Sequence, residues 1–325
     1  MRTTHNIDSY LDGLKQGKIA LLSRAITLIE STRPEHQELA GRLIDRVLPL
    51  TTGSVRIGIT GVPGVGKSTF IESYGMRLIE QSHKVAVLAI DPSSSISKGS
   101  ILGDKTRMER LSVHPDAFIR PSSSSGSLGG VTYKTHEAAL LCEAAGFDRI
   151  IIETVGVGQS ETEVSHLSDF FLLLMLAGAG DELQGIKRGI MELADALVIT
   201  KADGHNAERA KAARSEYARA LHFLPPQTSG WIPEVKICSA YEGSGITEVA
   251  DMIDRFVAQQ KSTGHFQQRR QMQRLHTFRR LLQEALSRQL YARPGFQQTI
   301  ESVEEALMQD KISPYSAVRA LMDKV

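Results

Sequence analysis

The sequence has few cysteines, no long hydrophobic run and almost no net charge. Two cysteines among 325 residues, Cys142 and Cys238, are too few for a disulfide framework and suit a reducing cytoplasm. The polar N-terminus lacks a signal-peptide core, and the longest apolar run, 170–177, is far shorter than the ~20 residues of a membrane span. A formal net charge of +1 gives no case for nucleic acid or an anionic membrane. We therefore expect a cytoplasmic protein with neither as a partner.

The stretch GVPGVGKST at residues 61–69 fits the phosphate-binding pattern Gly-x-x-x-x-Gly-Lys-[Ser/Thr]. As the pattern requires, a short apolar strand precedes it at 55–60 and a helical pattern follows at 68–81. Its glycines let backbone N–H groups point at phosphate oxygens at the start of a helix. Lys67 would reach the β- and γ-phosphates, and the Ser68 hydroxyl would ligate Mg²⁺. We predict a nucleotide site formed by Gly61, Val62, Pro63, Gly64, Val65, Gly66, Lys67, Ser68 and Thr69.

Apolar segments of strand length alternate with helical patterns from residue 55 onward. The second strand, 84–90, is a continuous apolar run, which is typical of a strand covered on both faces. This favours an α/β fold of the P-loop NTPase type with a doubly wound, mostly parallel sheet. Further strands are expected at 117–120, 148–152, 169–177, 195–200 and 234–238, and the segment 121–130 is expected to be a loop.

Polar segments follow several strands, at the edge where open α/β sheets bind ligands. Glu153 ends one strand three residues before Gly156. In this arrangement a carboxylate helps to hold Mg²⁺ through water, and a glycine N–H can sense the γ-phosphate. The segment 91–107, rich in serine and glycine, is expected to be a mobile loop beside the phosphates. The charged segment 178–189 could equally be a solvent-facing loop.

The segment KAD at 201–203 resembles the guanine-reading Asn-Lys-x-Asp motif. In that motif the aspartate accepts two N–H bonds from guanine that adenine cannot offer, and the lysine packs along the base. Thr200 stands where Asn is usual, which leaves one supporting hydrogen bond open. After the last strand, the Ser-Ala pair at 239–240 resembles a segment that contacts guanine O6. GTP is therefore favoured over ATP, with base contacts from Lys201, Asp203, Ser239, Ala240 and Tyr241.

Helical patterns flank this core on both sides, between residues 7 and 48 and again from 264 onward. An apolar stripe at helical spacing covers 272–290, and we expect it to be buried on a second copy of the chain or across the core. The basic side chains of 261–293 are interpreted as a solvated face. We predict an N-terminal helical extension at 1–53, a nucleotide-binding domain at 54–260 and a C-terminal helical arm at 261–325.

Together these motifs resemble the MeaB/ArgK-type GTPases that accompany methylmalonyl-CoA mutase. Beside the phosphate loop and TKAD (200–203), the resemblance rests on AIDPSS (89–94), GDKTRM (103–108), ETVGVGQSE (153–161) and GDELQGIK (180–187). It implies a homodimeric GTPase that uses GTP or GDP with Mg²⁺ and dimerises through the C-terminal arm. The implied partner is the adenosylcobalamin-dependent mutase. The GTPase cycle would gate cofactor loading and protect or restore that enzyme.

The resemblance also assigns the metal and switch residues. Ser68, Asp91, Asp104 and Glu153 would hold Mg²⁺ and its waters. The segments 91–107, 153–168 and 178–187 would be switch loops that respond to the γ-phosphate.

Catalysis needs neutralised charge on the transferred phosphoryl group and a water aimed in line with it. Lys67 and Mg²⁺ would supply the charge. Asp104, Gln159 and Lys187 are candidates for aiming the water, and Arg107 is a possible arginine finger. Without a clear finger, we expect slow turnover that the partner accelerates.

Two other functions stay open. A metal-insertion GTPase, such as a nickel-delivery protein, would need a Cys/His cluster, and the ten histidines show no ligand spacing with either cysteine. A P-loop kinase linked to transport would need an acceptor pocket and a base, and a guanine-reading Asp203 argues against it.

Overall fold

The computed structural model describes residues 6–51, 53–91, 108–123, 128–154, 160–178, 188–225 and 227–323. The chain forms two compact units, Met1–Gln273 and Arg274–Val325. The domain boundaries that we place at residues 53 and 260 stay predictions.

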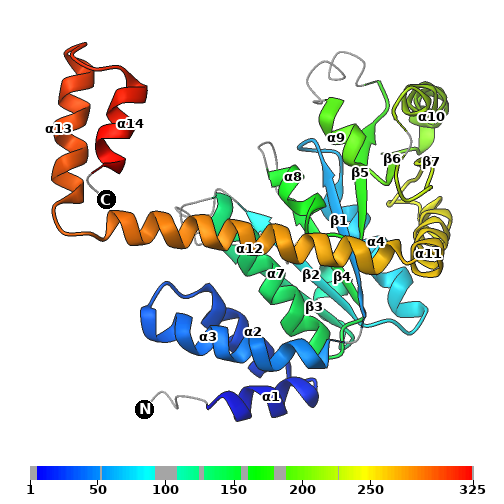
Figure 1. Ribbon diagram of the computed structural model, residues 1–325. Helices are drawn as coiled ribbons and strands as arrows, with labels where there is room; N and C mark the ends of the chain where they lie inside the picture. The colour runs from blue at the N-terminus through cyan, green and yellow to red at the C-terminus, as the bar shows by residue number, and fades with distance from the viewer. Residues whose placement is uncertain are drawn as a thin grey trace. The chain divides into compact units, whose positions relative to one another are not determined.

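A sheet of seven parallel strands forms the centre of the first unit (Figure 1). Its strand order is β3-β2-β4-β1-β5-β6-β7, which confirms the predicted doubly wound sheet. The strands are β1 (Val55–Gly61), β2 (Val85–Asp91), β3 (Ala117–Ser123), β4 (Arg149–Thr154), β5 (Phe170–Leu176), β6 (Ala196–Thr200) and β7 (Glu234–Ile237). The inner strands are buried on both faces, as their unbroken apolar runs require.

Helices cover both faces of the sheet. Side chains alternate along each strand, so Ile57 and Ile59 of β1 pack on one face while Ile150 and Ile152 of β4 pack on the other. The first face is covered by α4 (Lys67–Glu80), α6 (Glu109–Ser112) and α11 (Ile246–Ser262). The second is covered by α7 (Leu128–Ala144), α8 (Ser160–Ser165), α9 (Arg188–Leu193) and α10 (Ala207–His222). On α7 pack α1 (Ile7–Lys15), α2 (Ile19–Glu30) and α3 (Pro34–Val47).

Strand β3 extends further than the sequence predicts, and helix α7 begins inside the segment expected to be a loop. The segment 121–130, expected to be a loop, contributes Pro121 and two more residues to β3 and its last three residues to α7. The expectation is therefore wrong for 121–123 and 128–130, while 124–127 lie outside the described residues. The strand continues through Pro121 because β3 is an edge strand. A proline there can turn its missing N–H away from the neighbouring strand without costing a ladder hydrogen bond.

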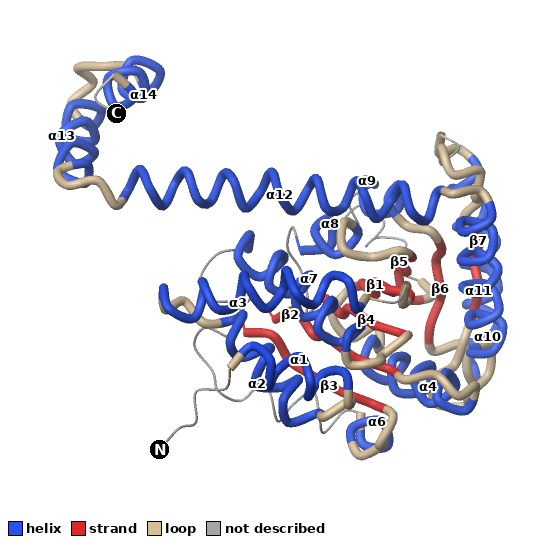
Figure 2. Tube along the Cα trace, turned by 60° about the horizontal axis from the view of Figure 1, so that its bottom comes forward, coloured by secondary structure: helices blue, strands red, loops and turns tan. Residues whose placement is uncertain are grey.

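The C-terminal segment is helical. Helix α12 (His265–Tyr291) runs without a break in Figure 2, and α13 (Phe296–Met308) and α14 (Pro314–Met322) follow it and pack against each other. The side chain of Ser313 accepts a hydrogen bond from the Ser316 N–H and so caps α14. Of the helices described, none is long and apolar enough to cross a membrane.

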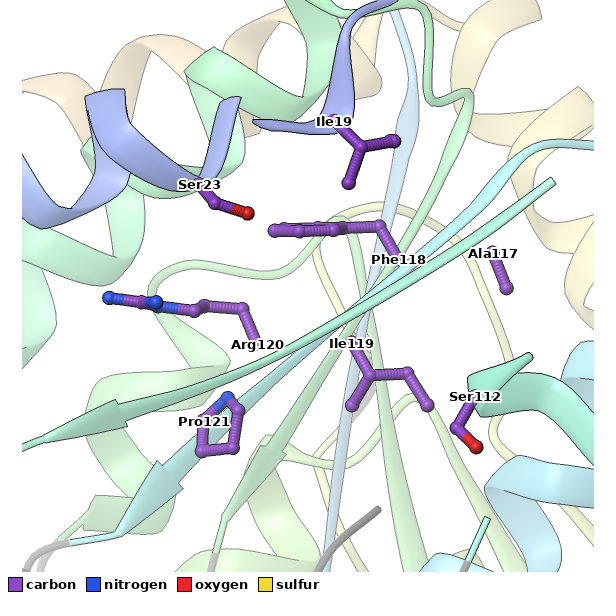
Figure 3. Close-up of a pocket in the computed structure, with 8 residues that line it drawn as sticks. All are labelled: Ile19, Ser23, Ser112, Ala117, Phe118, Ile119, Arg120 and Pro121. Atoms are coloured by element: carbon purple, nitrogen blue, oxygen red, sulfur yellow. The ribbon is translucent and has the colours of Figure 1, made fainter. Parts of the chain in front are cut away.

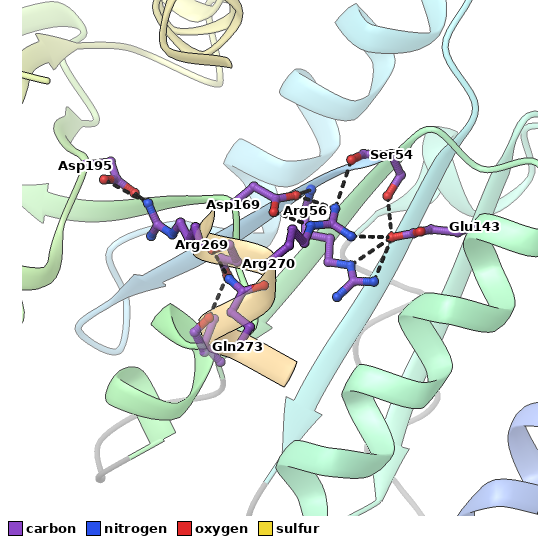
Figure 4. Close-up of polar contacts among 10 residues, drawn as sticks. Ser54, Arg56, Glu143, Asp169, Asp195, Arg269, Arg270 and Gln273 are labelled. Carbon is purple, nitrogen blue, oxygen red and sulfur yellow. Dashed lines mark hydrogen bonds and ion pairs between the residues drawn. The ribbon is translucent and has the colours of Figure 1, made fainter. Parts of the chain in front are cut away.

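Buried charges fix the start of α12 to the sheet, at the edge where the strands begin (Figure 4). Arg56 of β1 is 2% exposed and lies 2.8 Å from Glu143 of α7. Arg270 of α12 donates to both Glu143 (3.1 Å) and Asp169 (2.6 Å). Burial opposes charge on Arg270, but these carboxylates outweigh it and raise the pKa of the guanidinium. Two cations thus face two anions.

Asp169 and a further carboxylate, Asp195, also accept backbone N–H groups at the starts of strands. Asp169 accepts the Arg56 N–H at 2.8 Å, and Asp195 accepts the Phe171 N–H at 2.8 Å while it binds Arg269 of α12 at 3.0 Å. The interpretation of 261–293 as a solvated basic face is therefore wrong for Arg270, which is largely buried because acidic side chains from distant segments surround it.

Candidate nucleotide-binding site

The register of the parallel strands gathers the predicted site at one edge of the sheet. Strand β1 lies between β4 and β5, with Ile59 opposite Glu153 and Gly61 opposite Leu174. The hydroxyl groups of Thr60 and Thr154 join the ends of β1 and β4 at 2.9 Å. Because the carboxyl ends of parallel strands meet at one edge, the loops that follow β1, β2, β4, β5, β6 and β7 all leave from here.

The phosphate loop has a backbone that needs its glycines. Gly66 adopts the left-handed conformation (φ +96°) immediately before α4. A Cβ on Gly61 would lie 2.6 Å from the Leu174 carbonyl oxygen, so β5 could not approach β1 as it does. The loop therefore ends at the N-terminus of a 14-residue helix, where unpaired N–H groups favour an anion.

Lys67, the first residue of α4, lies across this loop. Its Nζ donates to the carbonyl oxygens of Gly61 (2.7 Å) and Val62 (3.4 Å). Burial lowers the pKa of its ammonium group, and the carboxylates of Glu153 and Glu161 oppose that effect. A cation is thus placed where the motif puts the phosphates.

Ser68 and Glu153 lie side by side. The Ser68 hydroxyl donates to Glu153 Oε1 at 3.3 Å, and Glu153 is buried at the end of β4. A hydroxyl beside a carboxylate is a pair of hard oxygen donors, which fits Mg²⁺. Within the described part of the chain, no three His, Cys, Asp or Glu residues are grouped to hold a metal. Mg²⁺ commonly completes such a small donor set with water and substrate phosphates.

Several predicted residues cannot be placed. Asp104, Arg107, Gly156, Gln159 and Lys187 lie outside the described residues, as does the side chain of Asp91, whose backbone ends β2.

Asp203 is held in place by the segment after β7. The buried Ser239 donates its hydroxyl to Asp203 Oδ2 at 2.6 Å, and it accepts the Glu242 N–H at 3.1 Å. The Ala202 N–H donates to the Cys238 carbonyl oxygen at 3.0 Å. The carboxylate predicted to read guanine is therefore aimed by the serine of the predicted Ser-Ala pair.

Lys201 and Tyr241 border the same place. Lys201 has a left-handed backbone (φ +56°), and its Cε lies 3.8 Å from where a Cβ on Gly66 would be. The end of its aliphatic chain therefore lies beside the phosphate loop. Tyr241 is 91% exposed, so its ring has no packed position in this structure.

Thr200, which stands where the guanine-reading motif usually has Asn, makes a supporting hydrogen bond of its own. Its hydroxyl donates to the carbonyl oxygen of Val65 in the phosphate loop at 2.6 Å and lies 3.2 Å from that of Met175 in β5. Strand β6 is therefore tied to the phosphate loop by a threonine in place of asparagine. The motif position could have suggested such a tie, but not its partner.

A separate pocket of about 230 Å³ lies at the edge strand β3 (Figure 3). It contains none of the predicted site residues and is lined by Ile19, Ser23, Ser112, Ala117, Phe118, Ile119, Arg120 and Pro121.

The family described as methylmalonyl Co-A mutase-associated GTPase MeaB matches residues 22–295. This chain belongs to the MeaB family. It is 46% identical to GTPase ArgK of Escherichia coli, over 95% of this chain and 94% of that protein. It is 45% identical to the mouse methylmalonic aciduria type A homolog, mitochondrial, over 97% of this chain and 79% of that protein.

A solved relative has the same fold. The crystal structure of a LAO/AO transport system kinase superposes with a TM-score of 0.79 at 39% identity, over 99% of this chain and 98% of that chain. The predicted P-loop NTPase fold and the resemblance to MeaB are confirmed, and the chain is a GTPase of that family.

Thr200→Val should loosen the phosphate loop. Valine fits the same space but cannot donate, so the buried Val65 carbonyl loses its bond, at a cost of about 1–3 kcal/mol. We expect a lower free energy of unfolding in urea and weaker binding of fluorescent GDP. Thr299→Val, which removes an exposed threonine hydroxyl of α13, is the matched control. If Thr200→Val binds GDP as tightly as the control, the tie has no role in holding the loop.

Proposed function

We propose that this MeaB-family protein binds and hydrolyses GTP with Mg²⁺ at the described site and serves an adenosylcobalamin-dependent methylmalonyl-CoA mutase in the cytoplasm. The nucleotide assignment rests on two groups of residues, one at the phosphate loop and one around Asp203. Lys67, Ser68 and Glu153 gather at the phosphate loop, and Asp203 is aimed by Ser239 beyond it. Lys201, two residues before Asp203, brings its Cε close to Gly66 of the phosphate loop.

The roles of the residues follow from their positions. The amides of the phosphate loop and the Lys67 ammonium would bind the phosphates, while Ser68 and Glu153, with Asp91 and Asp104, would hold Mg²⁺. When bound, Mg²⁺ neutralises charge on the phosphate oxygens. The base would contact Lys201, Asp203, Ser239, Ala240 and Tyr241, and Gly156 would sense the γ-phosphate.

Three residues are candidates for orienting the attacking water. In the sequence, Asp104, Gln159 and Lys187 follow β2, β4 and β5, and Arg107 is the candidate arginine finger. Because the sequence has no clear arginine finger, turnover alone would be slow and the partner would accelerate it.

The mutase partner is supported by names of relatives. The family description names methylmalonyl Co-A mutase, and the mouse relative is named for methylmalonic aciduria. We propose that GTP binding and hydrolysis gate cofactor loading and the protection or reactivation of that mutase.

The exposed stripe of α12 supports a homodimer. Met272, Leu275, Phe278, Leu282 and Leu286 follow helical spacing and are each between 46% and 59% exposed. A row of large apolar side chains on one helix face is typical of an interaction surface. We propose that a second copy of the chain covers this row.

The structure gives little support to the two alternatives. Burial raises the pKa of both Cys142 and Cys238, which disfavours the thiolate that a metal needs. The solved relative is named a transport system kinase, whereas the relative ArgK is named a GTPase. Release of free phosphate without an acceptor distinguishes a GTPase from a kinase.

Asp203→Asn should change the base preference. Asparagine offers an N–H where guanine also presents donors, while xanthine presents a carbonyl at position 2. Bonds to charged groups contribute about 1.5–3 kcal/mol, so we expect the preference for GTP over XTP to fall by about 10- to 100-fold in kcat/KM. Lys67→Ala is the control and should abolish hydrolysis of both nucleotides. An unchanged preference would remove Asp203 from base recognition.

Leu282→Glu should yield monomers, because the new charge would be buried in the apolar contact between two copies. Ser287→Glu adds the same charge five residues along, on a face turned about 140° away from Leu282, and should leave the dimer intact. Sedimentation velocity measures the mass of each. A monomeric wild-type protein, or equal behaviour of the two variants, contradicts the proposed dimer contact.

Adding the mutase should raise the rate of GTP hydrolysis about tenfold or more, as partner-supplied catalytic groups do in other GTPases. Steady-state phosphate release is measured with and without adenosylcobalamin-dependent methylmalonyl-CoA mutase. Lys67→Ala with the mutase controls for a contaminating GTPase. Unchanged turnover counts against the mutase as the accelerating partner.

A further inference from the structure

Helix α4 contains a serine, Ser73, whose hydroxyl group makes a hydrogen bond outside the helix. Ser73 Oγ donates to the carbonyl oxygen of Ala240 at 2.8 Å, across 167 residues of sequence. Serine within a helix commonly bonds the carbonyl four residues earlier, as Ser215 of α10 does with Lys211 at 3.2 Å. Serine is also a weaker helix former than alanine. The side chain of Ser73 thus adds a contact between elements at a position where alanine would suit the helix better.

This bond joins the two halves of the site. Helix α4 begins at Lys67 of the phosphate loop, and Ser73 lies six residues further along it. Ala240 follows Ser239, which aims Asp203. The segment after β7 is fixed at Ser239 by its N–H, which donates to the Ser244 carbonyl oxygen at 2.9 Å. At Ala240 it is fixed by Ser73.

We propose that Ser73 is a positioning residue for selection of the base at its 6-position. The proposal rests on the function proposed above, in which Ala240 contacts guanine. With Ser239 anchored on one side and the Ala240 carbonyl anchored on the other, the peptide N–H of Ala240 has a set direction. That N–H is the donor for an oxygen at position 6 of the purine. Asp203, which would read positions 1 and 2, is bonded by Ser239 rather than by Ser73, so its recognition of those positions should not depend on the Ser73 hydroxyl.

The test separates the two base positions. Dissociation constants are measured for GTP, 6-thio-GTP and ITP with the wild type and Ser73→Ala. In 6-thio-GTP a sulfur, a weak acceptor, replaces only O6, and ITP lacks only the 2-amino group. We expect the GTP over 6-thio-GTP preference to fall about three- to tenfold in Ser73→Ala, as for the loss of one hydrogen bond. The GTP over ITP preference should not change.

Two further variants make the result decisive. Ser215→Ala removes a serine hydroxyl within a helix and should alter neither preference. Ser73→Thr keeps the hydroxyl and should restore the 6-position preference. If Ser73→Ala changes both preferences equally, or neither, the positioning role is overturned. A wild type that binds ATP as tightly as GTP overturns the proposed guanine site itself, and this is seen before any variant is made.

Discussion

The central strand β1 is held at both ends, and the site depends on this constraint. At its start, Arg56 lies in the buried charge cluster and its N–H donates to Asp169. At its end, Gly61 begins the phosphate loop, pressed against the Leu174 carbonyl. Because β4 and β5 flank it in register, no edge of β1 is open. The phosphate loop is therefore mounted on a strand with little freedom to shift.

The charge cluster shows why this constraint is strict. Burying a charge costs several kcal/mol unless a partner compensates, so each member of the cluster requires the others. Glu143 serves both Arg56 and Arg270 and bonds the Ser54 hydroxyl at 2.7 Å. Burial raises its pKa, but the arginines and that bond prevail, and the pKa of Glu143 lies below its usual value. The first turns of α12 thereby belong to the same unit as the sheet.

How much of this could be predicted from the sequence depends on the distance along the chain over which each pattern acts. The strands and the phosphate loop follow from local signals, since apolar runs and the fixed spacing of 61–69 lie within a few residues. The partners of Ser73 and Arg270 lie over 100 residues away, so no local pattern identifies them. The prediction ended the strand before Pro121 because proline commonly interrupts strands. An edge strand tolerates proline, and β3 continues through it.

The hydrogen bonds of Thr200 to Val65 and of Ser73 to Ala240 would affect nucleotide binding in different ways. Thr200 bonds the phosphate loop itself, and every nucleoside triphosphate presents the same phosphates to that loop. A change there alters the binding of all of them alike. Ser73 bonds the segment that follows β7, which would contact the base in the proposed site. Selectivity is a difference between affinities, so only the second kind of tie can change it. In the proposed site, overall affinity and selection at the 6-position would therefore depend on separate hydrogen bonds. The bond from Thr200 shows that a threonine at this position can supply a donor to the phosphate loop.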